Sequence, residues 1–407
     1  MTAAANAIPP LTDESAVLAW TARMRRQHPV WQGPFGGWHV FRHADVRTVL
    51  RDTDSFSSDL SRVVPGMPPR APGMVTQFDP PEHRELRGVL SAAFTPRSIA
   101  ALEPRIREVT GQLLDAAGDR FELVEALTQP LPITVIAELL GLPPQDHGLF
   151  ARWTAALFEM QNGESPSDPS IGDHIGAVLA PLSRYLAERC RERRTAPGDD
   201  LISRLLTASS PGRALDDEEA TNFAVTLLLA GHITTTALLG NIVRTLDEHP
   251  QVWADLHVDP TRIPPVIEEV MRYRPSFPAL QRATVAPVEL SGVAVPAGAL
   301  VTAWILAANR DPDAHADPDR FDPGRGIGGA AQLTLGHGVH FCLGAPLARL
   351  EARVVLEELL KRTERLAIDH DRADEMVSFE QVILGPRRLP VITHPSRPGD
   401  KVTTPNS

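Results

Sequence analysis

The pattern of apolar and polar positions along the chain is mainly that of helices. Where apolar residues recur every three or four positions, we expect a helix with one buried face. Alternating runs bounded by proline and glycine, at 38–41, 288–295 and 300–303, indicate short strands. The chain is therefore predicted to be mainly α with a small β part. The helical stretches are 44–51, 82–92, 96–116, 132–140, 145–160, 171–194 and a helix that begins near Ile263.

One helical stretch, from about residue 216 to 246, is apolar on nearly every side. It opens with four acidic residues, which complement the positive end of a helix dipole. Its apolar part, 223–243, is close to the roughly 20 residues that span a bilayer. It also carries several threonines, His232 and Asn241, which are typical of a helix buried inside a large protein. We expect a core helix and no membrane span.

Composition narrows the classes of protein to consider. The net charge of −11 over 407 residues argues against nucleic-acid binding. The N-terminus lacks the charged-then-apolar order of a signal peptide, and two cysteines fit a reducing cytoplasm. We expect a cytoplasmic, monomeric protein with one domain over residues 1–392. Residues 393–407, rich in proline and polar residues, are predicted to be a flexible tail.

The segment 335–344, Leu-Gly-His-Gly-Val-His-Phe-Cys-Leu-Gly, contains the most informative residue, Cys342. Its glycines, Gly336, Gly338 and Gly344, suit a loop with unusual backbone angles. A helical pattern follows at once, so the helix N-terminus is expected to favour the thiolate form of Cys342. Such a thiolate is a metal ligand or a nucleophile. A buried structural cysteine, or a zinc site with His337 and His340, are the alternatives.

This loop resembles the haem-ligand loop of the cytochrome P450 family, Phe-Gly-x-Gly-x-His-x-Cys-x-Gly. The chain departs from it at Leu335, which stands in the place of the usual phenylalanine. The resemblance implies the P450 fold, a triangular helical prism with a long central helix over haem b. It also implies that Cys342 is the iron ligand. The matching positions are Gly336, Gly338, His340, Cys342 and Gly344.

Two further groups of residues match family motifs. Glu269 and Arg272 lie three positions apart and so share a helix face. The resemblance implies that they are buried and tied to Arg325 as a structural core. The buried haem propionates would need cationic partners. By resemblance, these are His83, Arg87, Arg282 and His340.

The middle of the long helix, Ala-Gly-His-Ile-Thr-Thr-Thr at 230–236, resembles the oxygen-activation stretch of the family. Gly231 is expected to let the helix pass close over the haem and to leave a kink there. Thr234 matches the threonine that supports proton delivery, although a bond to its own helix is the alternative. Ile233 stands where the family usually has an acid. Protons would then come through His232, ordered water or a substrate hydroxyl.

By resemblance, variable segments of the chain surround the substrate. Their side chains here are mainly apolar, which favours a sizeable apolar molecule. The chain most resembles soluble bacterial P450s that tailor polyketides or macrolides, in antibiotic biosynthesis. The expected pocket residues are Met67, Met74, Phe158, Ala230, Phe277, Leu280 and Ile383.

The chain has no flavin- or nicotinamide-binding fingerprint, so electrons must come from another protein. We expect electrons from NAD(P)H through a ferredoxin reductase and a ferredoxin, with O2 as co-substrate. Arg84, Arg349 and Arg353 are predicted to form a basic surface for that ferredoxin.

The sequence thus predicts a haem-thiolate monooxygenase, an oxidoreductase that hydroxylates or epoxidises a small molecule. Two alternatives follow from Ile233. One is a peroxide-driven or non-oxygenating haem-thiolate enzyme, and the other is a haem sensor or carrier without catalysis. A zinc hydrolase that uses His337, His340 and Cys342 is the third alternative.

Overall fold

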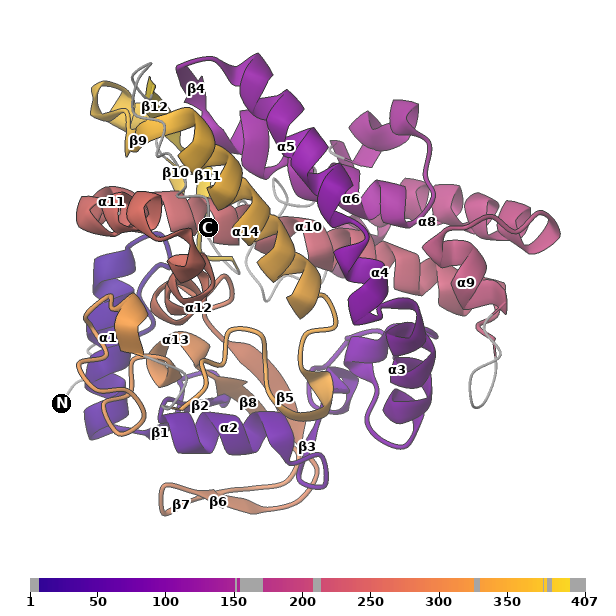
Figure 1. Cartoon of the computed structure of the whole chain (residues 1–407). Helices are drawn as coiled ribbons and strands as arrows, with labels where there is room; N and C mark the ends of the chain where they lie inside the picture. Colours follow the sequence, from indigo (N-terminus) through magenta and orange to yellow (C-terminus); the bar gives the residue numbers. More distant parts are fainter. Residues whose placement is uncertain are drawn as a thin grey trace.

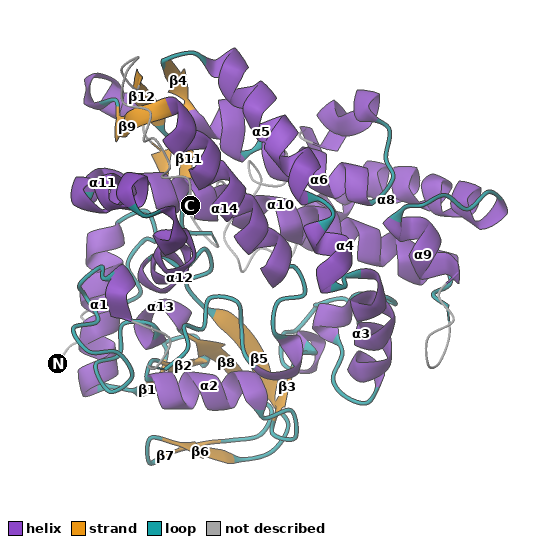
Figure 2. Ribbon diagram, viewed as in Figure 1, coloured by secondary structure: helices purple, strands orange, loops and turns teal. Residues whose placement is uncertain are grey.

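The computed structural model describes residues 7–150, 152–153, 171–207, 214–325, 330–375, 377–378 and 383–395. Helices dominate, as the apolar spacing predicts (Figure 2). The helices are α1 (Glu14–Gln27), α2 (His43–Arg51), α3 (Glu82–Ala93), α4 (Pro96–Ala100), α5 (Glu103–Ala117), α6 (Pro130–Leu139), α8 (Ile171–Thr195), α9 (Leu201–Thr207), α10 (Asp217–Glu248), α11 (Pro250–Val258), α12 (Ile263–Tyr273), α13 (Ile305–Ala308) and α14 (Ala345–Arg362).

The strands form four small sheets, the largest with the strand order β1-β2-β8-β5-β3. A second sheet has the order β4-β12-β9, and β6–β7 and β10–β11 are two-stranded. The strands are β1 (Val30–Gln32), β2 (Trp38–Val40), β3 (Phe56–Ser57), β4 (Arg120–Glu122), β5 (Leu280–Thr284), β6 (Val288–Leu290), β7 (Val293–Val295), β8 (Leu300–Ala303), β9 (Thr363–Ile368), β10 (Val377–Ser378), β11 (Pro386–Arg388) and β12 (Pro390–Pro395).

The helix α10 runs through the middle of the molecule, and α14 crosses in front of it in Figure 1. Asp216 caps the N-terminus of α10, and Glu219 completes a capping box. By length and hydropathy alone α10 could cross a membrane, but 67% of its most apolar window is buried. Figure 1 shows the five-stranded sheet and α2 on one side of the molecule, and α5, α6, α8 and α9 on the other. The helix α10 is therefore the core helix that its composition predicts.

Several predicted elements differ from the observed ones. The predicted helix 96–116 is two helices, α4 and α5, because Pro104 has no N–H to donate to Ala100. The predicted strand 288–295 is a hairpin, β6–β7, turned by Ser291 and Gly292 at positive φ. The strand β12 includes residues 393–395, so the tail prediction begins too early. Half of the predicted helix 145–160 lies outside the described residues.

Candidate active site

The Cys342 loop joins the sheet side of the molecule to the helical side. Gly336 and Gly338 both have φ +76°, a conformation that disfavours a side chain. A side chain at Gly338 would also meet the backbone of α2, with a Cβ only 3.0 Å from Arg51 Cα. Gly344 differs from the prediction, because its φ is −79° and it serves as the N-cap of α14. The backbone N–H of Cys342 donates to Leu335 O at 2.8 Å, which closes the loop.

Burial raises the pKa of the Cys342 thiol. Backbone N–H groups of Gly344 and Ala345, together with Arg87 and Arg349, act in the opposite direction but do not overcome it. The N–H groups at the start of α14 thus favour the thiolate, as expected, but burial outweighs them. A bound metal ion would remove the thiol proton, because metal coordination requires the thiolate.

A cavity of about 270 Å³ lies over this loop. Leu335, Cys342 and Leu347 line it on one side, and residues of α10 line it on the other. Most of its lining side chains are apolar, among them Phe94, Phe223 and Leu238. We call it the inner cavity. It holds a cysteine sulfur opposite the middle of α10, which is the arrangement that the sequence predicts.

Four basic side chains lie close together: His83, Arg87 and His340 line the inner cavity, and Arg282 lines the cavity beside it. Asp79 is the carboxylate that acts on His83 and Arg282. His83 is 2% exposed, and neither of its ring nitrogens has a hydrogen-bond partner among the described residues. Its ring lies 4.2 Å from that of His340, centroid to centroid. The Arg87 guanidinium donates to Phe341 O at 2.7 Å, and that of Arg282 donates to the carbonyl of its neighbour Gln281.

Burial depresses the pKa values of His83, His340 and Arg282. Burial first, and then Arg87, lowers the pKa of His83 to about 4. Burial and Arg282 lower the pKa of His340 to about 3, and burial lowers that of Arg282 to about 10. Buried polar and charged groups of this kind are costly unless a hydrogen-bond partner or an anion pairs with them. Together with the cysteine and the apolar cavity, they fit a haem that enters with its two carboxylates toward these donors.

The middle of α10 supplies the wall opposite Cys342, and it is one unbroken helix. The helix continues through Gly231 without a break, and a side chain there would meet Ile136 of α6 at 2.9 Å. Thr234 lines the inner cavity, while its hydroxyl donates to Ala230 O at 2.7 Å. This is the helix-internal bond named as the alternative. This bond leaves the oxygen lone pairs of Thr234 free to accept a hydrogen bond from a donor in the cavity.

His232 and Ile233 do not line the inner cavity. His232 is 1% exposed, its ring nitrogens have no partner within the described chain, and burial lowers its pKa to about 3. It is therefore neutral at physiological pH, which argues against its predicted role as a proton donor. Ile233 packs in a small apolar cluster with Ala237, Phe277 and Ile383. An acid at position 233 would face these side chains.

The predicted structural core is present. Arg272 donates to both carboxylate oxygens of Glu269 at 2.8 Å, and Arg325 donates to one of them at 3.0 Å. Arg272 also donates to the carbonyls of Asn309 and Pro318. Glu269 and Arg272 are 5% and 3% exposed. The group ties α12 to the segment that leads to the cysteine loop.

The predicted pocket residues fall into separate places. Ala230, Phe277 and Leu280 line the inner cavity, and Met67 lines a second cavity described below. Met74 lines neither of the two, and Ile383 packs beside Ile233 instead. Phe158 lies outside the described residues.

Two other predicted groupings do not form. Arg349 pairs with Glu268, and Arg353 pairs with Glu103 and Glu357, so both charges of the expected basic surface are neutralised. Arg84 is exposed on α3. For the zinc alternative, His337 contacts Arg47 and His340 contacts Ser58. Within the described ranges, no three histidine, cysteine or acidic side chains are grouped to hold a metal ion.

Sequence reasoning missed Glu351, which lines the inner cavity from α14. Its side chain is almost fully buried, one carboxylate oxygen has no partner in the described structure, and burial raises its pKa to about 8. The sequence did contain a sign that Glu351 is buried, because it falls on the apolar face of the predicted helix after Cys342. A glutamate there is buried rather than solvated.

The chain matches the sequence profile "Cytochrome P450" over residues 178–392. It is 60% identical over 385 residues to the erythromycin C-12 hydroxylase of Saccharopolyspora erythraea, which covers 95% of this chain and 96% of that protein. The chain belongs to the cytochrome P450 family. It is 42% identical to cyclomarin C epoxidase CymV of Salinispora arenicola over 86% of this chain and 89% of that one.

Solved P450 structures agree with the fold. A mutant of P450 EryK in complex with erythromycin B superimposes with a TM-score of 0.91. It is 59% identical and covers 96% of this chain and 99% of that one. The protein is therefore a P450 monooxygenase, an oxidoreductase that uses haem, O2 and electrons from a reductant.

Proposed function

We propose that this P450 hydroxylates or epoxidises a macrolide in bacterial secondary metabolism. The observation that carries the proposal is the apolar inner cavity over Cys342, in a chain 60% identical to an erythromycin C-12 hydroxylase. An apolar cavity selects substrates by shape and by burial of hydrocarbon, which suits a lactone ring. We further place the enzyme in the cytoplasm as a monomer.

Cys342 would hold the haem iron through its sulfur, and His83, Arg87, Arg282 and His340 would pair with the propionates. Bound haem supplies the activation of O2. One oxygen atom enters the substrate and the other leaves as water, with two electrons and two protons consumed. The electrons would come from NAD(P)H through a ferredoxin reductase and a ferredoxin, which would dock near Arg84 and the exposed Phe341.

Residues of α10 would position the substrate and the protons. Ala230 and Gly231 leave room on the cavity wall, and the Thr234 oxygen can accept from water or from a substrate hydroxyl. Because Ile233 has no proton to relay and His232 is buried without lining the inner cavity, the protons would travel through water in the cavity. The side chains of Phe277 and Leu280 would hold the apolar part of the substrate away from that water.

A first experiment tests the class of chemistry and the substrate together. The reduced protein is saturated with carbon monoxide, and the ferric protein is titrated with a panel of macrolides. We expect the red-shifted Soret band of a thiolate-bound haem, a low-to-high-spin shift with a macrolide, and a product heavier by one oxygen. A histidine-type band, or no spin shift across the panel, would refute the proposal.

Ile233 favours a second candidate, a peroxide-driven enzyme that needs no proton relay from solvent. Turnover is compared with ferredoxin, reductase and NAD(P)H on one side and with hydrogen peroxide on the other. Product from peroxide alone, with none from the reductase system, would select this second candidate. Binding without any product would leave the non-catalytic sensor or carrier.

A further inference from the structure

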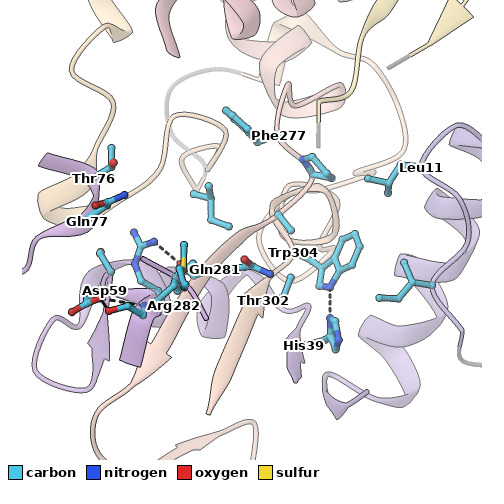
Figure 3. A pocket seen from close by; sticks show the side chains of 18 of the residues that line it. Leu11, His39, Asp59, Thr76, Gln77, Phe277, Gln281, Arg282, Thr302 and Trp304 are labelled. Atoms are coloured by element: carbon cyan, nitrogen blue, oxygen red, sulfur yellow. Dashed lines mark hydrogen bonds between the residues drawn. The ribbon is translucent and has the colours of Figure 1, made fainter. Parts of the chain in front are cut away.

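A second cavity of about 960 Å³ adjoins the inner one, and we call it the outer cavity (Figure 3). Thr76, Phe277 and Leu280 line both cavities, so the two cavities meet at these residues. At its rim, Ile8 and Met67 are 44% and 40% exposed. The outer cavity thus lies between the surface and the site over Cys342. With haem in the inner cavity, a large substrate would extend past these shared residues into the outer cavity.

The outer cavity has a row of polar side chains from three neighbouring strands. In the five-stranded sheet, Thr302 of β8 is paired with His39 of β2 and with Gln281 of β5. Side chains directly opposite each other on paired strands project from the same face. All three residues line the outer cavity, as Figure 3 shows. We call them the polar row.

The polar row has hydrogen-bonding capacity to spare. The Trp304 indole N–H donates to His39 Nδ1 at 3.1 Å, which leaves the proton of the neutral ring on Nε2. Burial lowers the pKa of His39 to about 4, so the ring is neutral at physiological pH. Within the part of the chain that the structure describes, neither the Thr302 hydroxyl nor the Gln281 amide has a hydrogen-bond partner. The row therefore offers neutral donors and acceptors to a ligand.

The charged groups at this cavity do not favour a cationic ligand. The Asp59 carboxylate accepts from the backbone N–H and the hydroxyl of Ser61. It also lies 3.5 Å from the guanidinium groups of Arg62 and Arg70. Arg70 and Arg282 line the same cavity. The one carboxylate that lines the cavity is already satisfied, Arg70 also pairs with Glu82, and Arg282 is assigned to the haem propionates. The charged groups at this cavity therefore already have partners, which favours a neutral ligand.

We infer that the outer cavity binds a neutral, hydroxyl-rich part of the substrate, a glycosyl group, through the polar row. The apolar lactone would then lie between the haem and the outer cavity, against Phe277 and Leu280, which line both cavities. This inference rests on the proposed function and specifies its substrate class as a macrolide glycoside whose bound sugar carries no charge. His39, Thr302 and Gln281 are specificity-determining residues, since they contact the part of the substrate that does not react.

The test compares three probes: a macrolactone, the same lactone with one neutral deoxyhexose, and the same lactone with one dimethylamino sugar. Holoenzyme variants Gln281→Leu and Thr302→Val remove one polar group each with little change in volume. Affinity is measured by the spin-state shift and by calorimetry. We expect each variant to bind the neutral glycoside about fivefold more weakly, the loss of roughly one hydrogen bond, and the aglycone within about twofold of the parent protein.

Gln32→Leu is the matched control, because it makes the same change on β1 of the same sheet, outside both cavities. It should leave all three affinities unchanged. An equal loss for lactone and glycoside, or no loss for either, would overturn the inference. So would tighter binding of the amino-sugar glycoside than of the neutral one by the parent protein. Failure of all three probes to bind would instead overturn the proposed function, and the inference with it.

Discussion

At the scale of single residues, side chains in the middle of the molecule matter through what surrounds them. Ile233 stands where the family motif that this helix resembles has an acid, and its neighbours Ala237, Phe277 and Ile383 form an apolar cluster. Glu351 is the reverse case, a carboxyl group in apolar surroundings with a pKa near 8. Both residues have physical consequences that substitution can measure.

The substitution Ile233→Glu places a carboxyl group in this apolar cluster, which costs about 1–3 kcal/mol of folding free energy. Haem content should stay unchanged, because Ile233 does not line the inner cavity, where Cys342 lies. The ratio of product formed to NAD(P)H consumed should change, since the variant adds a proton-carrying group beside the cavity. Ile233→Leu controls for packing. A large loss of haem in the glutamate variant alone would contradict this account of the site.

Glu351→Gln should change how stability depends on pH. In the folded protein Glu351 keeps its proton up to about pH 8, whereas in the unfolded chain it ionises near pH 4.5. The wild-type protein therefore loses stability from this group as pH rises through that window. The glutamine variant should gain about 3 kcal/mol on the wild type between pH 4.5 and pH 7, measured by urea unfolding. Exposed Glu364→Gln should show no such trend; a flat difference for Glu351→Gln would refute its burial as a neutral acid.

At the scale of elements, α5 and α14 are held together by a network of ion pairs. Arg107 of α5 contacts Glu357 and Glu358 of α14, and Arg353 of α14 contacts Glu103 of α5. Although burial opposes ionisation, hydrogen bonds from Lys361, Arg107 and Arg362 lower the pKa of Glu358 to about 2. The network fixes the helix that begins directly after the cysteine loop.

Glu358→Gln should destabilise the protein by about 1–2 kcal/mol at pH 7, between the values of exposed and buried pairs. Because the folded pKa is depressed, this stability is present above about pH 4.5 and is lost as pH falls toward 2. Thermal unfolding at pH 7 and at pH 3 measures the difference. Asp115→Asn, at the exposed edge of the same network, should cost less than about 0.5 kcal/mol. Equal effects of the two variants would show that burial of Glu358 is immaterial.

At the scale of the whole molecule, Glu269, Arg272 and Arg325 connect α12 to the segment before the cysteine loop. Glu269→Gln leaves the buried Arg272 without its carboxylate and should cost about 3–5 kcal/mol. We expect lower haem content and a lower melting temperature. The adjacent Glu268→Gln, whose partner Arg349 is partly exposed, should cost under about 1 kcal/mol. Similar melting temperatures for the two variants would contradict this structural role.

The sequence predicted those parts of the molecule whose residues lie close together along the chain. The cysteine loop, the Glu269–Arg272 pair and the long helix were all found, because each is a local pattern with a local physical reason. The polar row was not, because His39, Gln281 and Thr302 meet only through the pairing of distant strands. The apolar surroundings of Ile233 were not predicted either, because its neighbour Ile383 comes from a distant turn. Apolar composition placed Met74 in the pocket, but it could not distinguish the lining of a cavity from packing beside it.

The three-stranded sheet also constrains the order in which the molecule can be completed. β12 lies between β4 and β9, with Val391 and Leu389 fully buried, and it follows both of them in the chain. As a ribosome releases the polypeptide, β4 and β9 emerge without the strand that joins them. The three-stranded sheet therefore cannot form until residues 390–395 have left the ribosome. A nascent chain halted just before them would carry two unpaired edges, which are exposed to aggregation and to proteases.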